Sequence, residues 1–106
     1  VERKYFPEPN TNQEFKTPAF EKGGFTKYKQ LVEFLEDYQE SHKDYVKLSY
    51  IGETQGGKQI PILYITKENS ESKIKLWYQA GVHGNEPAST EGVLHFMNQI
   101  FDLHVI

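Results

Sequence analysis

An apolar run, Ile74–Ala80, passes directly into a glycine-containing turn and then into a helix start, an order that narrows the possible folds sharply. From Leu76 the run is nearly continuous in bulky residues, which is typical of a strand covered on both faces of a sheet. Pro87 suits the first turn of the helix, because the N–H that proline lacks would have no partner there. The apolar face of that helix is predicted to carry Val93, Leu94, Met97, Ile100 and Phe101. A strand that leads into a helix in this way indicates an α/β fold.

A second helix is predicted earlier in the chain, with Thr26 as its N-cap and an end near Ser41. Its apolar face is expected to carry Tyr28, Leu31, Val32, Leu35 and Tyr38. The preceding segment, residues 1–24, contains three prolines and no sustained period, so we expect an extended arm whose aromatic side chains pack on a neighbouring surface. We therefore divide the chain into this arm and a domain over residues 25–106.

Two strands are predicted between that helix and the apolar run. Val46–Ile51 alternates in polarity, and Ile60–Thr66 is rich in β-branched and other apolar residues. The polar, glycine-containing break Thr54–Lys58 joins them as a hairpin. Pro61 cannot donate a ladder hydrogen bond, so its strand is expected at an edge. With Ile74–Ala80 as a further strand, we expect a partial mixed β-sheet with flanking helices.

Charge and composition exclude several kinds of partner. The net charge is −3 and the lysines are interspersed with glutamates, so no basic stripe is available to bind nucleic acid. No apolar stretch reaches the roughly 18 residues that a membrane span needs, and the first residues lack the apolar centre of a signal peptide. The chain has no cysteine, so a metal site would have to use His, Asp or Glu.

The segment between the apolar run and the last helix carries the residues best suited to chemistry. It reads Gly81-Val82-His83-Gly84-Asn85-Glu86-Pro87, and it lies where α/β sheets bind ligands, beyond the carboxyl end of a strand. Zinc readily takes a neutral imidazole and a carboxylate as ligands. The two glycines allow a sharp turn, so that side chains three positions apart can converge on one ion. His83 and Glu86 are therefore the candidate metal ligands.

Simpler interpretations exist for each of these residue types. His83 can be a turn residue hydrogen-bonded to its own loop, and Glu86 can be a carboxylate at the positive end of a helix. Glu91 and His95 stand four positions apart, which is typical of an ion pair on the surface of a helix. His42 lies near a helix end, where a favourable interaction with the helix dipole is expected.

The order of these motifs resembles that of the zinc metallocarboxypeptidases of the carboxypeptidase A type, peptidase family M14. That family shows a helix, a hairpin turn Gly-x-Ser-x-x-Gly-Arg-x-Ile, and a strand that ends Ala-Gly-[apolar]-His-x-x-Glu. Gly52–Ile60 and Ala80–Glu86 match the two motifs, with Thr54 in place of the serine and Lys58 in place of the arginine. The resemblance extends over about Phe25–Phe101.

The resemblance implies that this chain is the N-terminal part of a zinc-carboxypeptidase-like (phosphorylase/hydrolase-like) catalytic domain. It implies one Zn²⁺ bound by His83 and Glu86, with a second histidine ligand, a glutamate general base and substrate-binding arginines beyond Ile106. No catalytic residue is then assigned to this chain. The implied activity is hydrolysis of the C-terminal bond of peptides or proteins, and the implied location is secreted or periplasmic. The chain alone is expected to be inactive, to bind zinc weakly and to self-associate.

Two other functions fit the same segment. Amide deacylases of the aspartoacylase and succinylglutamate desuccinylase type share a Gly-x-His-Gly-Asn-Glu motif and a related fold. The order of helix and hairpin before the motif favours the peptidase over this alternative. A non-catalytic module that binds carbohydrate or protein, or a pseudoenzyme on the same scaffold, is the alternative outside the enzymes.

Overall fold

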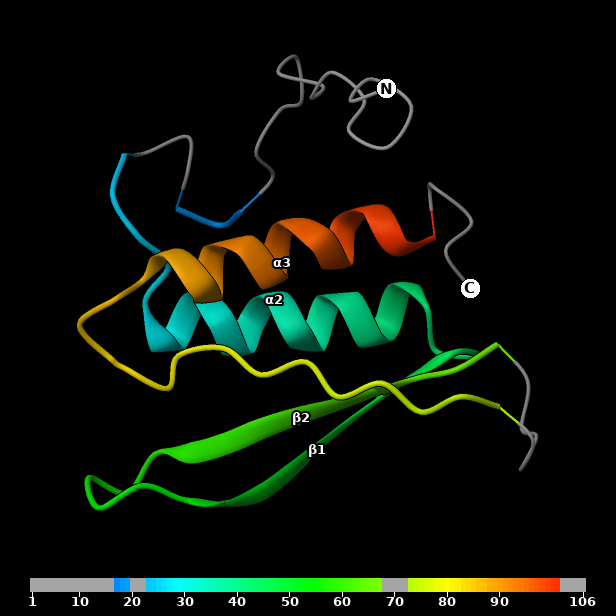
Figure 1. The fold of residues 1–106 in the computed structure, drawn as a ribbon, viewed down its shortest axis with the longest axis horizontal. Helices are drawn as coiled ribbons and strands as arrows, with labels where there is room; N and C mark the ends of the chain where they lie inside the picture. Colours follow the sequence, from blue (N-terminus) through cyan, green and yellow to red (C-terminus); the bar gives the residue numbers. More distant parts are fainter. Residues whose placement is uncertain (1–16, 20–22, 68–72, 102–106) are drawn as a thin grey trace, which may run out of the picture.

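The computed structural model describes residues 17–19, 23–67 and 73–101. Its elements, in chain order, are α2 (Tyr28–Ser41), β1 (Val46–Glu53), β2 (Gln59–Ile65) and α3 (Ala88–Ile100). Helix α3 runs alongside α2, and the β1–β2 hairpin lies on the other side of α2 (Figure 1). The predicted α/β class is confirmed. Neither described helix is long and apolar enough to cross a membrane.

Helix α2 begins one residue later than predicted. Its N-cap is Lys27, and the Lys27 N–H donates a hydrogen bond of 2.8 Å to the side chain of Gln30. The N–H of Thr26, the predicted N-cap, is instead donated to Glu91 Oε1 of α3 at 2.6 Å. The prediction was wrong because the backbone N–H of Thr26 is engaged by Glu91, whereas the side chain of Gln30 accepts the N–H of Lys27.

The hairpin forms as predicted around the Thr54–Lys58 break. Val46 pairs with Ile65 and Leu48 pairs with Leu63, so these apolar residues share the face that packs on the core. In the turn, the Lys58 N–H donates to Thr54 Oγ1 at 3.1 Å, and the Thr54 N–H donates to the Lys58 carbonyl at 2.8 Å.

Pro61 of β2 lies opposite Tyr50 of β1. The sheet formed by the described residues has two strands, in the order β1–β2, so both strands are edges. In this sheet Pro61 lies in an edge strand, where its missing N–H can be tolerated.

The third predicted strand, Ile74–Ala80, does not form within the described part of the chain. These residues follow an extended path past α2 and the hairpin without joining the described sheet, which is antiparallel rather than mixed (Figure 1). Ile74 is 89% exposed and Trp77 is 70% exposed. The apolar pattern was correct for a buried strand, but a strand also needs a hydrogen-bonded neighbour, which pattern alone cannot supply. Self-association through these apolar side chains stays a prediction.

The core lies where both helices meet the start of β1. Its buried members are Leu35, Tyr38, Val46, Leu94, Met97 and Ile100. The Tyr38 hydroxyl donates a buried hydrogen bond of 2.8 Å to the Met97 carbonyl, which links α2 to α3. The two predicted apolar helix faces therefore pack against each other and against the hairpin.

The ends of the two helices are joined by aromatic contacts. His42 is the C-cap residue of α2, and its Nδ1 lies 3.1 Å from the Tyr38 carbonyl oxygen. Its ring stacks on Phe101, with ring centroids 4.3 Å apart and an interplanar angle of 8°. His42 therefore makes the helix-end contact that the sequence favoured over a metal site.

Most of the predicted N-terminal arm lies outside the described residues. Within the arm's described part, Thr17 and Ala19 are buried. The aromatic side chains of the arm lie outside the described residues, so their packing on a neighbouring surface stays a prediction.

Candidate metal centre

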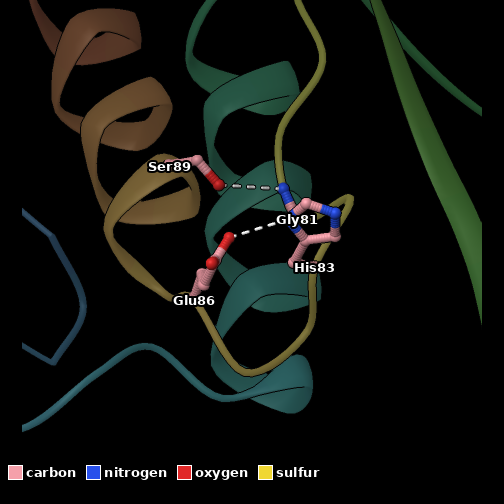
Figure 2. A network of polar contacts seen from close by, with 4 residues as sticks. All are labelled: Gly81, His83, Glu86 and Ser89. Carbon is pink, nitrogen blue, oxygen red and sulfur yellow. Dashed lines mark hydrogen bonds and ion pairs between the residues drawn. The ribbon is translucent and has the colours of Figure 1, made fainter.

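The candidate metal turn, residues 81–87, is held at its start by the first turn of α3. Gly81 has a φ of 73°, a left-handed conformation that favours glycine. Its N–H donates a hydrogen bond of 3.1 Å to Ser89 Oγ (Figure 2). A Cβ added at Gly81 would lie 3.3 Å from Thr90 Oγ1. The backbone therefore enters the metal turn in close contact with α3.

The structure brings the two predicted ligands together. His83 Nδ1 lies 2.8 Å from Glu86 Oε2, and the two side chains point toward one another (Figure 2). The backbone supports this approach, because the Glu86 N–H donates to the His83 carbonyl at 3.0 Å. The side chains are 70% and 67% exposed, so both remain open to an ion arriving from solvent.

The donor set of this pair fits zinc. His83 Nδ1 and Glu86 Oε2 face each other, and an imidazole nitrogen and a carboxylate oxygen are both ligands that zinc takes. Two donors that each lie about 2.0 to 2.2 Å from one tetrahedral zinc are themselves about 3.4 Å apart. A small opening of the 2.8 Å contact would make room for the ion.

Within the described residues, no cluster of three or more His, Cys, Asp or Glu side chains could hold a metal ion. His83 and Glu86 thus form a pair rather than a complete set. A catalytic zinc usually has three protein ligands and one open position. Any further protein ligand would have to come from outside the described part of the chain.

Glu91 makes a contact that the sequence did not predict. Spacing along a helix suggested His95 as its partner, but Glu91 accepts the Thr26 N–H across 65 positions of sequence. Burial alone would raise the pKa of the Glu91 carboxyl. The Thr17 and Thr26 side chains and the Thr26 backbone N–H outweigh burial and lower this pKa below its usual 4.5. Glu91 therefore fastens the segment before α2 to the first turn of α3.

Replacing Glu91 with glutamine is expected to remove an acid-sensitive part of the stability. A carboxyl with a lowered folded-state pKa stabilises the fold above pH 4.5, and that contribution disappears as the pH falls through the lowered value. In thermal unfolding, Glu91→Gln should be less stable than the native chain at neutral pH and equal to it in strong acid. The control is Glu36→Gln, on an exposed position of α2. A gap between Glu91→Gln and the native chain that stays constant with pH would contradict this account.

Ser89 is the other residue of this region that sequence reasoning missed. Its hydroxyl accepts the Gly81 N–H eight positions earlier, which closes the segment that carries His83 and Glu86. A serine in the first turn of a helix, after a glycine-containing turn, was the available signal. Such a serine most often serves the helix itself, so the signal does not identify its partner.

Comparison with known proteins finds similarity to carboxypeptidases. The family model described as "Zinc carboxypeptidase" matches residues 31–104. The protein named "Probable carboxypeptidase 2" from Trichophyton verrucosum (strain HKI 0517) is 32% identical in an alignment of 53 residues, gaps included, that takes in 44% of this chain. A protein of the same name from Arthroderma benhamiae (strain ATCC MYA-4681 / CBS 112371) is likewise 32% identical over 53 residues.

In each of these relatives the matched part is 10% of the protein's own length. The family match takes in α3, the hairpin, the metal turn and most of α2. Because it covers well over half of the 106 residues, the chain belongs to the zinc carboxypeptidase family.

Proposed function

We propose that His83 and Glu86 are two ligands of a single catalytic zinc ion in a metallocarboxypeptidase that removes residues from the C-termini of peptides or proteins. The observation that carries this proposal is the 2.8 Å approach of His83 Nδ1 to Glu86 Oε2 on an exposed turn. Family membership supports the choice of metal and of reaction. Because the matched stretch is 10% of the relative's own length, the activity is proposed for an intact protein that contains this chain.

The chemistry that a bound zinc supplies is polarisation of the scissile carbonyl and a lowered pKa for the attacking water. In this chain, His83 offers a ring nitrogen and Glu86 a carboxylate oxygen to the ion. Gly81 and Ser89 fix the backbone from which both side chains extend. Glu86 is assigned to metal binding and not to proton transfer, because a metal-bound carboxylate is poorly placed to accept the proton of the water.

The third ligand, the general base and the groups that bind the substrate carboxylate are proposed to lie beyond Ile106. On this proposal the chain alone is inactive, because general-base catalysis contributes about 10²- to 10⁴-fold and no residue of this chain is proposed as the base. A secreted or periplasmic location is also part of this proposal, and family membership is its only support.

The test is an assay of the intact protein with peptides that have a free or an amidated C-terminus, before and after treatment with a chelator. We expect the C-terminal residue to be released only from peptides with a free C-terminus. The chelator should abolish this activity, and added Zn²⁺ should restore it. Cleavage of N-acyl amino acids in place of peptides would support the deacylase alternative. No turnover of either substrate, with zinc bound, would support a non-catalytic module.

A further inference from the structure

A single hydrogen bond closes the loop that carries both candidate ligands. The loop leaves Gly81 and returns to α3, and the Gly81 N–H donates to Ser89 Oγ at 3.1 Å across its base (Figure 2). His83 and Glu86 both lie inside the closed segment. Gly81 also approaches Thr90 closely enough that an added Cβ would be 3.3 Å from its hydroxyl. The base of the loop is thus fixed to the helix by the hydrogen bond to Ser89, and a side chain at position 81 would crowd Thr90.

Neither ligand side chain is held in place by packing. The side chains of His83 and Glu86 are 70% and 67% exposed, and they make a polar contact with each other. The backbone path of the loop must therefore set their separation. A closed loop has fewer conformations to lose when its side chains converge on an ion. The Gly81–Ser89 hydrogen bond therefore reduces the conformational entropy that metal binding costs.

We propose that Ser89 is a positioning residue, which holds Gly81 against α3 so that His83 and Glu86 stay within reach of one metal ion. This role rests on the metal site proposed above. Ser89 itself is not a ligand, since its hydroxyl is engaged by the Gly81 amide. It acts only through the backbone of the loop.

Ser89→Ala removes the acceptor and keeps a residue that favours helices. A typical hydrogen bond of this kind corresponds to about a three- to tenfold change in an equilibrium constant. We therefore expect Zn²⁺ titrated into this chain to bind about three- to tenfold more weakly to Ser89→Ala, and Ser89→Thr to restore the native affinity. The exposed position of Ser89 predicts little change in thermal stability.

The matched control is Thr54→Ala. It also deletes a hydroxyl that accepts a backbone N–H at 3.1 Å on an exposed turn, but in the hairpin rather than the metal turn. Thr54→Ala should leave Zn²⁺ affinity at the native value. An equal loss in Thr54→Ala and Ser89→Ala would overturn the proposal, because the effect would then be general to the fold.

A measurement without metal separates this inference from the proposed function. In NMR spectra of the metal-free chain, Ser89→Ala should shift the Gly81 amide resonance, speed its hydrogen exchange and weaken the nuclear Overhauser contacts between His83 and Glu86. Ser89→Thr should restore all three. Native contacts between His83 and Glu86 in Ser89→Ala would overturn the positioning role. If the native chain binds Zn²⁺ no better than His83→Ala, the proposed metal function fails. The role of Ser89 in the loop is judged separately, and weakened contacts between His83 and Glu86 in the metal-free Ser89→Ala chain would still support it.

Discussion

Replacing His83 with alanine in the intact protein is expected to weaken Zn²⁺ binding by more than about 100-fold. Loss of a group that only supports a ligand commonly costs about 10- to 100-fold in metal affinity, so loss of a direct ligand should exceed the upper end of that range. Glu86→Ala should have an effect of the same size. Calorimetric titration with Zn²⁺ measures both, and peptide hydrolysis should fall in parallel.

The control for these two variants is Glu36→Gln, which neutralises an exposed carboxylate on α2 away from the metal turn. It should keep native affinity and activity. If Glu36→Gln lost affinity as Glu86→Ala does, the effect would come from the loss of a negative charge, and the assignment of Glu86 as a ligand would be contradicted. A native affinity in His83→Ala would contradict the assignment directly.

Leu94→Ala is expected to lower the free energy of unfolding of this chain by about 2 to 5 kcal/mol. Leu94 is 2% exposed and lies in the cluster where α3 meets α2 and β1, so its truncation leaves a cavity. For a domain of this size, such a loss lowers the melting temperature by roughly 10 °C or more. Thermal unfolding followed by circular dichroism measures the change.

The matched control is Leu76→Ala, the same substitution in the apolar run that follows β2. Leu76 is 74% exposed, and surface substitutions usually change stability by about 0.5 kcal/mol or less. We expect its melting temperature to stay close to that of the native chain. A loss as large as that of Leu94→Ala would mean that the run is packed, in contradiction to the structure.

The helices and the hairpin could be predicted because their signals are local. Helix α3 is predicted by Pro87 and by apolar residues at helical spacing, of which Leu94, Met97 and Ile100 are buried. The hairpin follows from two β-rich runs around Thr54–Lys58, whose turn hydrogen bonds join residues only a few positions apart. Each of these elements is determined within a short window of sequence.

The features that sequence reasoning missed all depend on distant partners. Thr26 is a good N-cap by type, yet its amide is donated to Glu91 and the helix begins after Lys27. The run after β2 has the composition of a strand but no hydrogen-bonded neighbour in the described sheet. Ser89 accepts the backbone N–H of Gly81. Because nearly every residue has a backbone N–H, the residue types do not reveal such a partner. Propensity cannot decide such cases, because tertiary contacts override it.

The candidate metal pair was the most predictable part of the site. His83 and Glu86 stand three positions apart between two glycines and a helix start, and the structure places their polar atoms 2.8 Å apart. The order of motifs also indicated the family that the comparison found. The support of the turn by α3 was not predictable, since it depends on how Gly81 packs against Ser89 and Thr90.

The most direct test of the metal site is Zn²⁺ titration of this chain with ¹⁵N-labelled histidine, followed by NMR. We predict that the Nδ1 resonance of His83 shifts with added Zn²⁺ far more than the ring resonances of His42 and His95, and that Glu86→Gln removes this selectivity. Equal shifts for the rings of His42, His83 and His95, or none for His83, would contradict the assignment of His83 and Glu86 as zinc ligands.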